Sequence, residues 1–149
     1  MNRRNQIILI LSFVAFSWLA MQTVHELGHV LGAVASGGEV KRVVLHPLVF
    51  SRTDVSPNPH PLFVVWMGPI IGIALPLVAF LLAKVMRLPG QYLFRFFAGF
   101  CLIANGIYIA GGSFQGLADA GDMLRHGSST WQLILFGLLT APLGLYLWN

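Results

Sequence analysis

Four long runs of apolar residues limit what this chain can fold into more than any other feature of its sequence. They cover residues 6–36, 62–85, 91–111 and 130–148 of the 149. A transmembrane helix needs about 20 apolar residues to cross roughly 30 Å of hydrocarbon. Only 9% of the residues are charged, whereas soluble domains carry about 25%. We therefore expect an all-α polytopic membrane protein, with about four transmembrane helices in a single domain over residues 1–149.

The segment between the first two runs has a different pattern from the helices around it. Its sequence "VKRVVLHPLVF" is rich in β-branched and aromatic residues and is interrupted by Pro47. This composition favours two short strands or an edge hairpin over a helix. Unpaired strand edges cannot face lipid, so we expect the hairpin to lie at the membrane interface. Gly37 and Gly38 are expected to end the first helix.

The charges give little indication of a macromolecular partner beyond the membrane. The net charge is +4, but the nine Lys and Arg residues are scattered along the chain. A nucleic-acid-binding protein would gather them in a basic patch, so we expect a lipid bilayer and no nucleic acid as partner. The single cysteine, Cys101, lies in an apolar run. It can form no intramolecular disulfide and is expected to be a buried side chain.

The distribution of basic residues bears on orientation in the membrane. Arg3 and Arg4 precede the first run and favour a cytoplasmic N-terminus under the positive-inside rule. That orientation puts five basic residues inside (Arg3, Arg4, Lys84, Arg87, Arg95) and four outside (Lys41, Arg42, Arg52, Arg125). The difference of one basic residue therefore does not determine the orientation. No A-x-A-like cleavage site precedes residue 25, so we expect the first run to be retained as a span.

The second half of the first run contains three ionisable residues in the sequence "HELGH", from His25 to His29. On a helix, residues four apart lie one turn apart on the same face, so both imidazoles can bind one metal ion. Glu26 then stands where zinc hydrolases with an H-E-x-x-H pattern carry their general base. The alternative is a polar helix end at the membrane interface. Ionisable groups inside a span are costly and mark functional sites, which favours a metal site.

Two histidines leave a catalytic zinc ion one protein ligand short, because such sites use three protein ligands and a water. Glu39 and Asp54 lie in the loop after the first run, without an apolar setting to hold them. Asp119 and Asp122 lie in "GLADAGDML", a glycine-broken segment between the last two runs. The two aspartates share a face if the segment is helical, so only one need bind metal. A capping aspartate at a helix start is the alternative for each.

Three motifs in order resemble the site-2 protease family of intramembrane zinc metalloproteases. They are "HELGH", "MGPIIGIALPL" and "LADAGDML", and the resemblance covers residues 24–124. That family pairs an H-E-x-x-H helix with an aspartate from a later segment, in a pattern like L-D-G. Aligning "LADAGDML" on this pattern implies that Asp119 is the third ligand, with Asp122 as the second choice.

The resemblance implies one zinc ion held by His25, His29 and Asp119, with Glu26 as general base. The implied reaction is hydrolysis of a peptide bond in or near a transmembrane segment of a membrane-protein substrate. The implied location is the cell membrane of a prokaryote, and the oligomeric state stays open. The alternative is a non-catalytic membrane metal-binding protein or an inactive protease relative. The presence of Glu26 argues against it, because a pure binding site needs no general base.

The sequence departs from the family pattern at two places. The family often carries an asparagine four residues after the glycine of its G-P motif, where this chain has Gly72. It also often has an N-x-x-P element shortly before the aspartate. The nearest asparagine here, Asn105, has no matching proline. Asn105 can donate a hydrogen bond to a substrate carbonyl or pack between helices, and the sequence leaves both roles open.

Overall fold

Long apolar helices make up most of the chain in the computed structural model, which describes residues 2–149. Within these residues, four helices are long and apolar enough to cross a membrane, which confirms the predicted fold class. They are α1 (Arg3–Ala35), α2 (Pro61–Val85), α3 (Gln91–Gln115) and α5 (Thr130–Trp148). Their bounds agree with the expected runs to within a few residues. A short helix, α4 (Ala118–Arg125), connects α3 to α5.

A two-stranded antiparallel sheet follows α1, as the sequence predicts. Strand β1 (Val40–Val44) pairs with β2 (Arg52–Val55), and Val43 lies opposite Thr53. The second strand begins after the Pro47 loop rather than inside the β-branched segment, because proline cannot donate a hydrogen bond to a strand ladder. Helix α1 ends where expected, since Gly37 adopts a φ of 77°, a conformation that glycine takes without steric cost.

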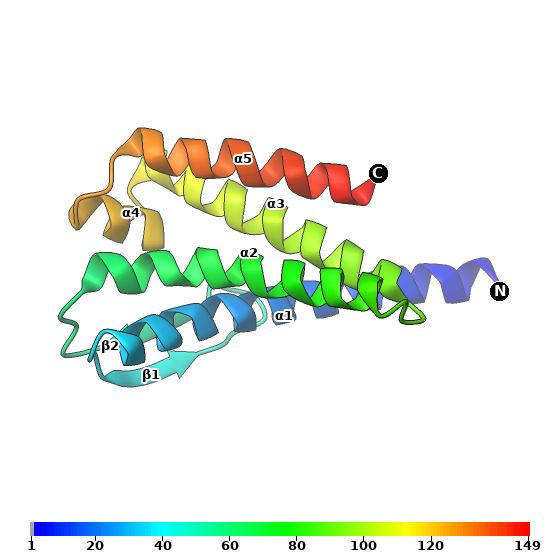
Figure 1. Ribbon diagram of the computed structural model, residues 1–149, viewed down its shortest axis with the longest axis horizontal. Coiled ribbons are helices and arrows are strands. Elements are labelled where there is room, and N and C mark those ends of the chain that lie inside the picture. Colours follow the sequence, from blue (N-terminus) through cyan, green and yellow to red (C-terminus); the bar gives the residue numbers. More distant parts are fainter. Residues whose placement is uncertain (1) are drawn as a thin grey trace.

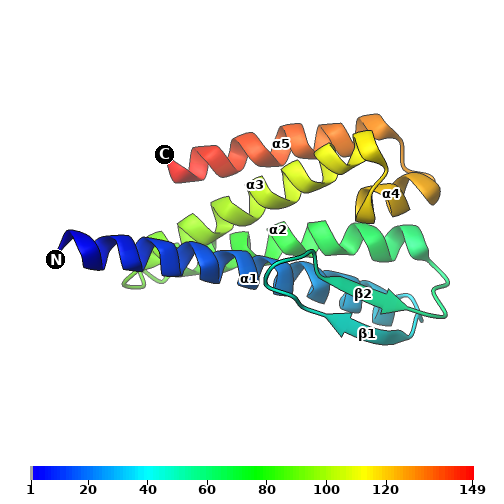
Figure 2. The ribbon, with the colours of Figure 1, turned by 180° about the vertical axis from the view of Figure 1, so that it is seen from behind.

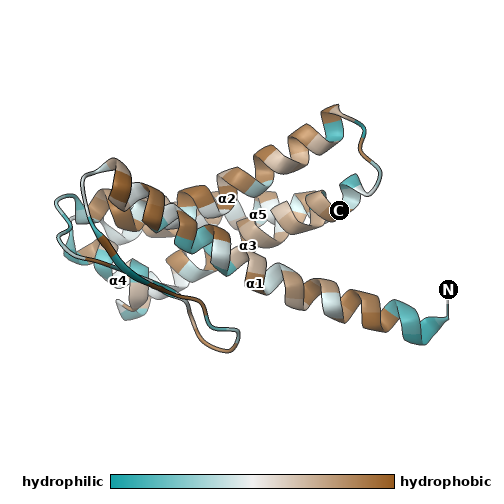
Figure 3. Cartoon of the chain, turned by 90° about the horizontal axis from the view of Figure 1, so that it is seen from below, coloured by the Kyte–Doolittle hydropathy of each residue, from teal (hydrophilic) through white to brown (hydrophobic). Residues whose placement is uncertain are grey.

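The helices pack side by side in a simple order (Figure 1). Helix α2 contacts both α1 and α3, and α5 packs along the other side of α3. Both termini and the α2–α3 turn lie at one end of the bundle, while the hairpin and α4 lie at the other end (Figures 1 and 2). Hydrophilic residues gather at these two ends, and the helices between them are mostly hydrophobic (Figure 3). Two polar ends around an apolar middle are the pattern of a protein embedded in a bilayer.

The outer surface of the bundle is strongly apolar. Along α1, the side chains from Ile7 to Leu11 are each 50–64% exposed, and large exposed apolar residues also occur on α2, α3 and α5. Monomeric soluble proteins rarely expose continuous apolar patches of this kind. We conclude that the chain is a membrane-embedded protein whose helices face lipid.

Glycine residues allow the first two helices to approach closely at the level of the polar residues. A Cβ atom at Gly28 of α1 would overlap the backbone carbonyl of Met67 in α2, and one at Gly68 of α2 would overlap the His29 imidazole. Small residues at crossing points allow this kind of close packing between membrane helices. The result is that the His29 ring lies directly against the α2 backbone.

Candidate metal centre

Helix α1 carries both motif histidines into the interior of the protein. His25 and His29 are each only 6% exposed, and their Nε2 atoms are 3.1 Å apart. The two rings meet edge to face, with centroids 4.8 Å apart. The four-residue spacing therefore directs both imidazoles to one point, as the sequence predicts.

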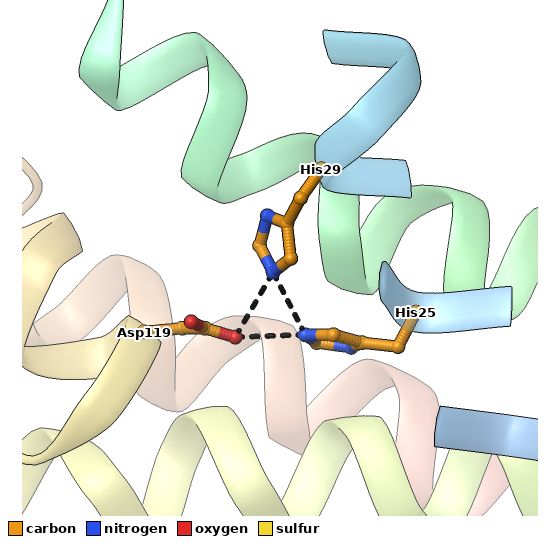
Figure 4. Close-up of side chains that lie close together, drawn as sticks. All are labelled: His25, His29 and Asp119. Atoms are coloured by element: carbon orange, nitrogen blue, oxygen red, sulfur yellow. Dashed lines mark hydrogen bonds and ion pairs between the residues drawn. The ribbon is translucent and has the colours of Figure 1, made fainter. Parts of the chain in front are cut away.

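The third member of the group comes from α4. At Gly116 the chain adopts a left-handed conformation, with a φ of 61°, and α3 ends there. The chain then turns into α4, whose first turn contains Asp119. The Oδ2 atom of Asp119 is 2.7 Å from His25 Nε2 and 3.4 Å from His29 Nε2. Figure 4 shows the three side chains converging from α1 and α4.

The structure distinguishes between the two aspartates of the "LADAGDML" segment. Asp122 forms an ion pair with Arg125 on the outside of α4, and its side chain is 48% exposed. The Asp119 side chain is 20% exposed and faces the histidines. Burial alone would raise the pKa of Asp119, but its hydrogen bonds with His25 and His29 hold that pKa well below the usual range. Asp119 is therefore a carboxylate at neutral pH.

The geometry of the three ligand atoms fits a metal ion. The two imidazole nitrogens and the carboxylate oxygen lie within 4.8 Å of one another. Tetrahedral zinc with bonds of 2.0–2.1 Å places neighbouring ligand atoms about 3.3 Å apart. The separations of 2.7, 3.1 and 3.4 Å differ from this value by about 0.6 Å or less. A His–His–Asp set of nitrogen and oxygen donors also suits zinc.

The other ring nitrogens of the histidines are held by hydrogen bonds. His25 Nδ1 lies 2.6 Å from the Asn105 Oδ1 atom, and Asn105 Nδ2 donates to the Cys101 carbonyl at 2.9 Å. His29 Nδ1 lies 3.0 Å from the Val64 carbonyl oxygen. These acceptors select the tautomer with the proton on Nδ1, an assignment made from the partners. A metal ion would replace the Nε2 hydrogen bonds to Asp119, and both Nε2 lone pairs would then be directed at the shared point, which is how proteins orient metal-binding histidines.

Sequence reasoning missed the contact between Asn105 and His25. Asn105 is only 1% exposed, and 80 positions separate the two residues. Gly72 of α2 makes room for this contact, because a Cβ atom there would lie 2.9 Å from Asn105 Oδ1. The Asn105 carboxamide from α3 therefore lies beside Gly72, the α2 position at which the site-2 protease family often has asparagine. The expected contact of Asn105 with a substrate stays a prediction.

Glu26 is buried beside the histidines and is held by the hairpin. It is 4% exposed, and its Oε2 atom accepts a hydrogen bond of 2.6 Å from the hydroxyl of Thr53 in β2. No sequence motif indicated Thr53, because no regular residue spacing relates a position in α1 to one in β2. The hairpin therefore contributes directly to the site.

Two cavities meet at this group of residues. One, of about 320 Å³, lies between α1 and α3 and has mainly apolar walls. The other, of about 400 Å³, lies between β2 and α4, and its walls include Arg52, Thr53 and Asp119. Tyr108 and Phe50 line both cavities. The His–His–Asp group thus has an apolar space on one side and a polar space on the other.

Comparisons with protein-family models, curated proteins and solved structures found no match to this chain. A functional conclusion therefore depends on the geometry of these residues and on the sequence motifs.

Proposed function

We propose that this protein is a zinc metalloprotease of the site-2 protease type, which cleaves a peptide bond in or near a transmembrane segment of a membrane protein. One observation carries the proposal. Two imidazole nitrogens from α1 and the Asp119 carboxylate from α4 converge within 4.8 Å, and α1 also bears the buried carboxylate of Glu26. The order of the three motifs along the chain supports the same assignment.

The proposed ligands are His25, His29 and Asp119. These residues would hold a zinc ion, which when bound would supply Lewis-acid polarisation of the scissile carbonyl and lower the pKa of bound water to about 7. Asn105 and the Val64 carbonyl keep the two rings in the orientation that binding requires. One carboxylate and two neutral imidazoles leave the ion with a net positive charge, which such chemistry needs.

Glu26 is the proposed general base. It takes a proton from the attacking water and passes it to the leaving amine. Thr53 donates to Oε2, so we assign the proton transfer to Oε1. The polar cavity between β2 and α4 provides a route for that water. A helical substrate must unwind first, because all its peptide groups are satisfied internally.

The proposed location is the cell membrane of a prokaryote, with a cytoplasmic N-terminus as Arg3 and Arg4 favour. The hairpin and α4 lie at the end of the bundle opposite both termini (Figure 1). With this orientation, the site is closer to the extracytoplasmic end of the bundle.

One observation favours the alternative, a non-catalytic metal-binding protein or inactive relative. The Thr53 hydroxyl holds a Glu26 oxygen at 2.6 Å, and a buried carboxylate held in this way can serve packing alone. Under this alternative, metal binding would occur without hydrolysis.

Replacement of Glu26 separates the two possibilities. The purified protein is loaded with zinc in bicelles and mixed with fluorescent transmembrane peptides, beside the Glu26→Gln variant. The proposal predicts cleavage by the wild type, a roughly 10²- to 10⁴-fold slower rate for Glu26→Gln, and equal zinc content. Equal rates would exclude Glu26 as the base. Zinc binding without cleavage by the wild type would favour the alternative.

A further inference from the structure

The apolar cavity between α1 and α3 lies directly beside the proposed reaction site. His25, Glu26 and Asn105 form part of its wall. Its volume of about 320 Å³ is near the lower end of the range of roughly 300–1,000 Å³ that small-ligand sites occupy. A space of this size admits a side chain but not a folded partner. An occupant would lie next to the residues that hold the metal and move the proton.

The walls of this cavity determine the chemistry of its occupant. Trp18 and Met21 come from α1, and Ala104 and Ile107 come from α3. Among residues 2–149, no Lys, Arg or Asp side chain lines the cavity.

The polar side chains in the wall already have hydrogen-bond partners, since Gln22 accepts from Ser51, Asn105 pairs with His25, and Glu26 accepts from Thr53. A charged or strongly polar occupant would therefore lose its hydration and gain few partners, which is costly. An apolar side chain that enters the cavity from water gains about 25 cal/mol for each Å² that it buries, and one that enters from lipid gains packing contacts instead.

The loop between the two strands, residues 45–51, forms the outer rim of the cavity. Its end is attached to α1, because Gln22 Oε1 accepts hydrogen bonds from the Ser51 amide at 3.0 Å and from the Ser51 hydroxyl at 2.6 Å. Phe50 packs against Tyr108 of α3, with ring centroids 5.2 Å apart. The cavity is therefore closed by protein on the hairpin side. Phe50 lines both this apolar cavity and the polar cavity between β2 and α4.

The small side chain of Ala104 leaves room for a bulky occupant. It precedes Asn105 on α3 and lines the cavity with a single methyl group. A larger side chain at this position would project into the same space. Ile107, one turn further along α3, lines the cavity as well and is 60% exposed, so shortening it enlarges the cavity without opening a hole in the core.

We propose that this cavity binds one large apolar side chain, of leucine to phenylalanine size, adjacent to the bond that is cleaved. The substrate class is therefore an extended membrane peptide with a bulky apolar residue beside the scissile bond. The link to cleavage rests on the proposed function, whereas binding of the side chain does not.

Binding can be measured with peptides that differ at one position only. The probes are labelled transmembrane peptides with a glycine-flanked central residue that is Ala, Leu or Phe. Their Kd values are measured by fluorescence anisotropy in bicelles with the zinc-loaded Glu26→Gln protein, which prevents turnover. We expect the Leu and Phe peptides to bind about 10-fold or more tightly than the Ala peptide, as contacts in an apolar pocket allow.

Two variants change the cavity in opposite directions. Ala104→Phe fills it and should abolish the preference for Leu and Phe, with zinc content unchanged. Ile107→Ala enlarges it and should raise the affinity for Phe relative to Leu, which keeps the test valid if Ala104→Phe does not fold. Ala15→Phe is the matched control, because Ala15 is exposed on α1 and does not line the cavity.

The possible outcomes separate this inference from the proposed function. The inference would be overturned if the preference for Leu and Phe peptides persisted in Ala104→Phe and did not change in Ile107→Ala. It would also be overturned if Ala15→Phe lost the preference as fully as Ala104→Phe does. Cleavage by the wild type without any preference would also overturn it and leave the protease assignment intact. Conversely, a cavity-dependent preference in a protein that cleaves nothing would support the binding site and contradict the protease assignment.

Discussion

Asn105 of α3 and His25 of α1 are joined by a hydrogen bond of 2.6 Å between Oδ1 and Nδ1. The Asn105 amide is itself fixed, because its Nδ2 atom donates to the Cys101 carbonyl. This arrangement presents an acceptor oxygen to the imidazole and leaves Nε2 for a metal ion. A residue outside every recognised motif therefore controls the orientation of a proposed zinc ligand.

Replacing Asn105 should weaken metal binding without removing a ligand. Asn105→Leu deprives His25 Nδ1 of its acceptor, and loss of such outer contacts typically lowers metal affinity about 10- to 100-fold. Asn105→Asp keeps an acceptor oxygen, so its zinc affinity should fall less than that of Asn105→Leu. Competition with a zinc-binding dye measures both affinities. An unchanged affinity in Asn105→Leu would show that the contact does not orient the ring.

The close approach of α2 to His29 predicts a steric effect at Gly68. Gly68→Ala places a methyl group against the His29 imidazole, and overpacking of this kind costs about 1–3 kcal/mol of unfolding free energy. Zinc affinity should fall as well, because the ring must move. Gly111→Ala is the control, since no atom lies within 4 Å of a Cβ there. Thermal unfolding and dye competition should show lower stability and lower zinc affinity for Gly68→Ala than for Gly111→Ala. Equal stability and affinity in the two variants would contradict the close packing of His29 against Gly68.

The hydrogen bond from the hairpin to Glu26 predicts a defect in turnover. Thr53→Val keeps the shape of the side chain but leaves a buried carboxylate oxygen without its partner, at a cost of about 1–3 kcal/mol. Peptide cleavage should slow, while zinc content stays at the wild-type level. Thr53→Ser keeps the hydroxyl and should retain most of the activity. Unaltered cleavage by Thr53→Val would show that the bond does not position Glu26.

Removal of metal should lower the stability of the protein. A ligand that binds only the folded state at a free concentration of a hundred times its Kd stabilises that state by about 2.7 kcal/mol. Zinc should therefore raise the Tm of the wild type, and a chelator should reverse the change. His29→Ala should show no zinc-dependent shift. A shift of equal size in His29→Ala would indicate that zinc binds elsewhere.

The sequence predicted those features that depend on local pattern. Hydropathy was enough to place the four spans, and the spacing of His25 and His29 was enough to predict their convergence. The spacing of Asp119 and Asp122 left both open as ligands, because residues three apart share a helix face, and only the family resemblance put Asp119 first. In the structure Asp119 faces the histidines and Asp122 pairs with Arg125. Contacts between distant elements, such as that of Thr53 with Glu26, leave no pattern in a single sequence.

Zinc analysis of purified variants tests the central claim most directly. The structure groups His25, His29 and Asp119 and pairs Asp122 with Arg125. The wild type and Asp122→Ala should therefore each bind one zinc ion per chain with similar affinity, whereas His25→Ala and Asp119→Ala should lose tight binding. A wild type that binds no zinc, or an Asp119→Ala variant that keeps full affinity while Asp122→Ala loses it, would contradict this account.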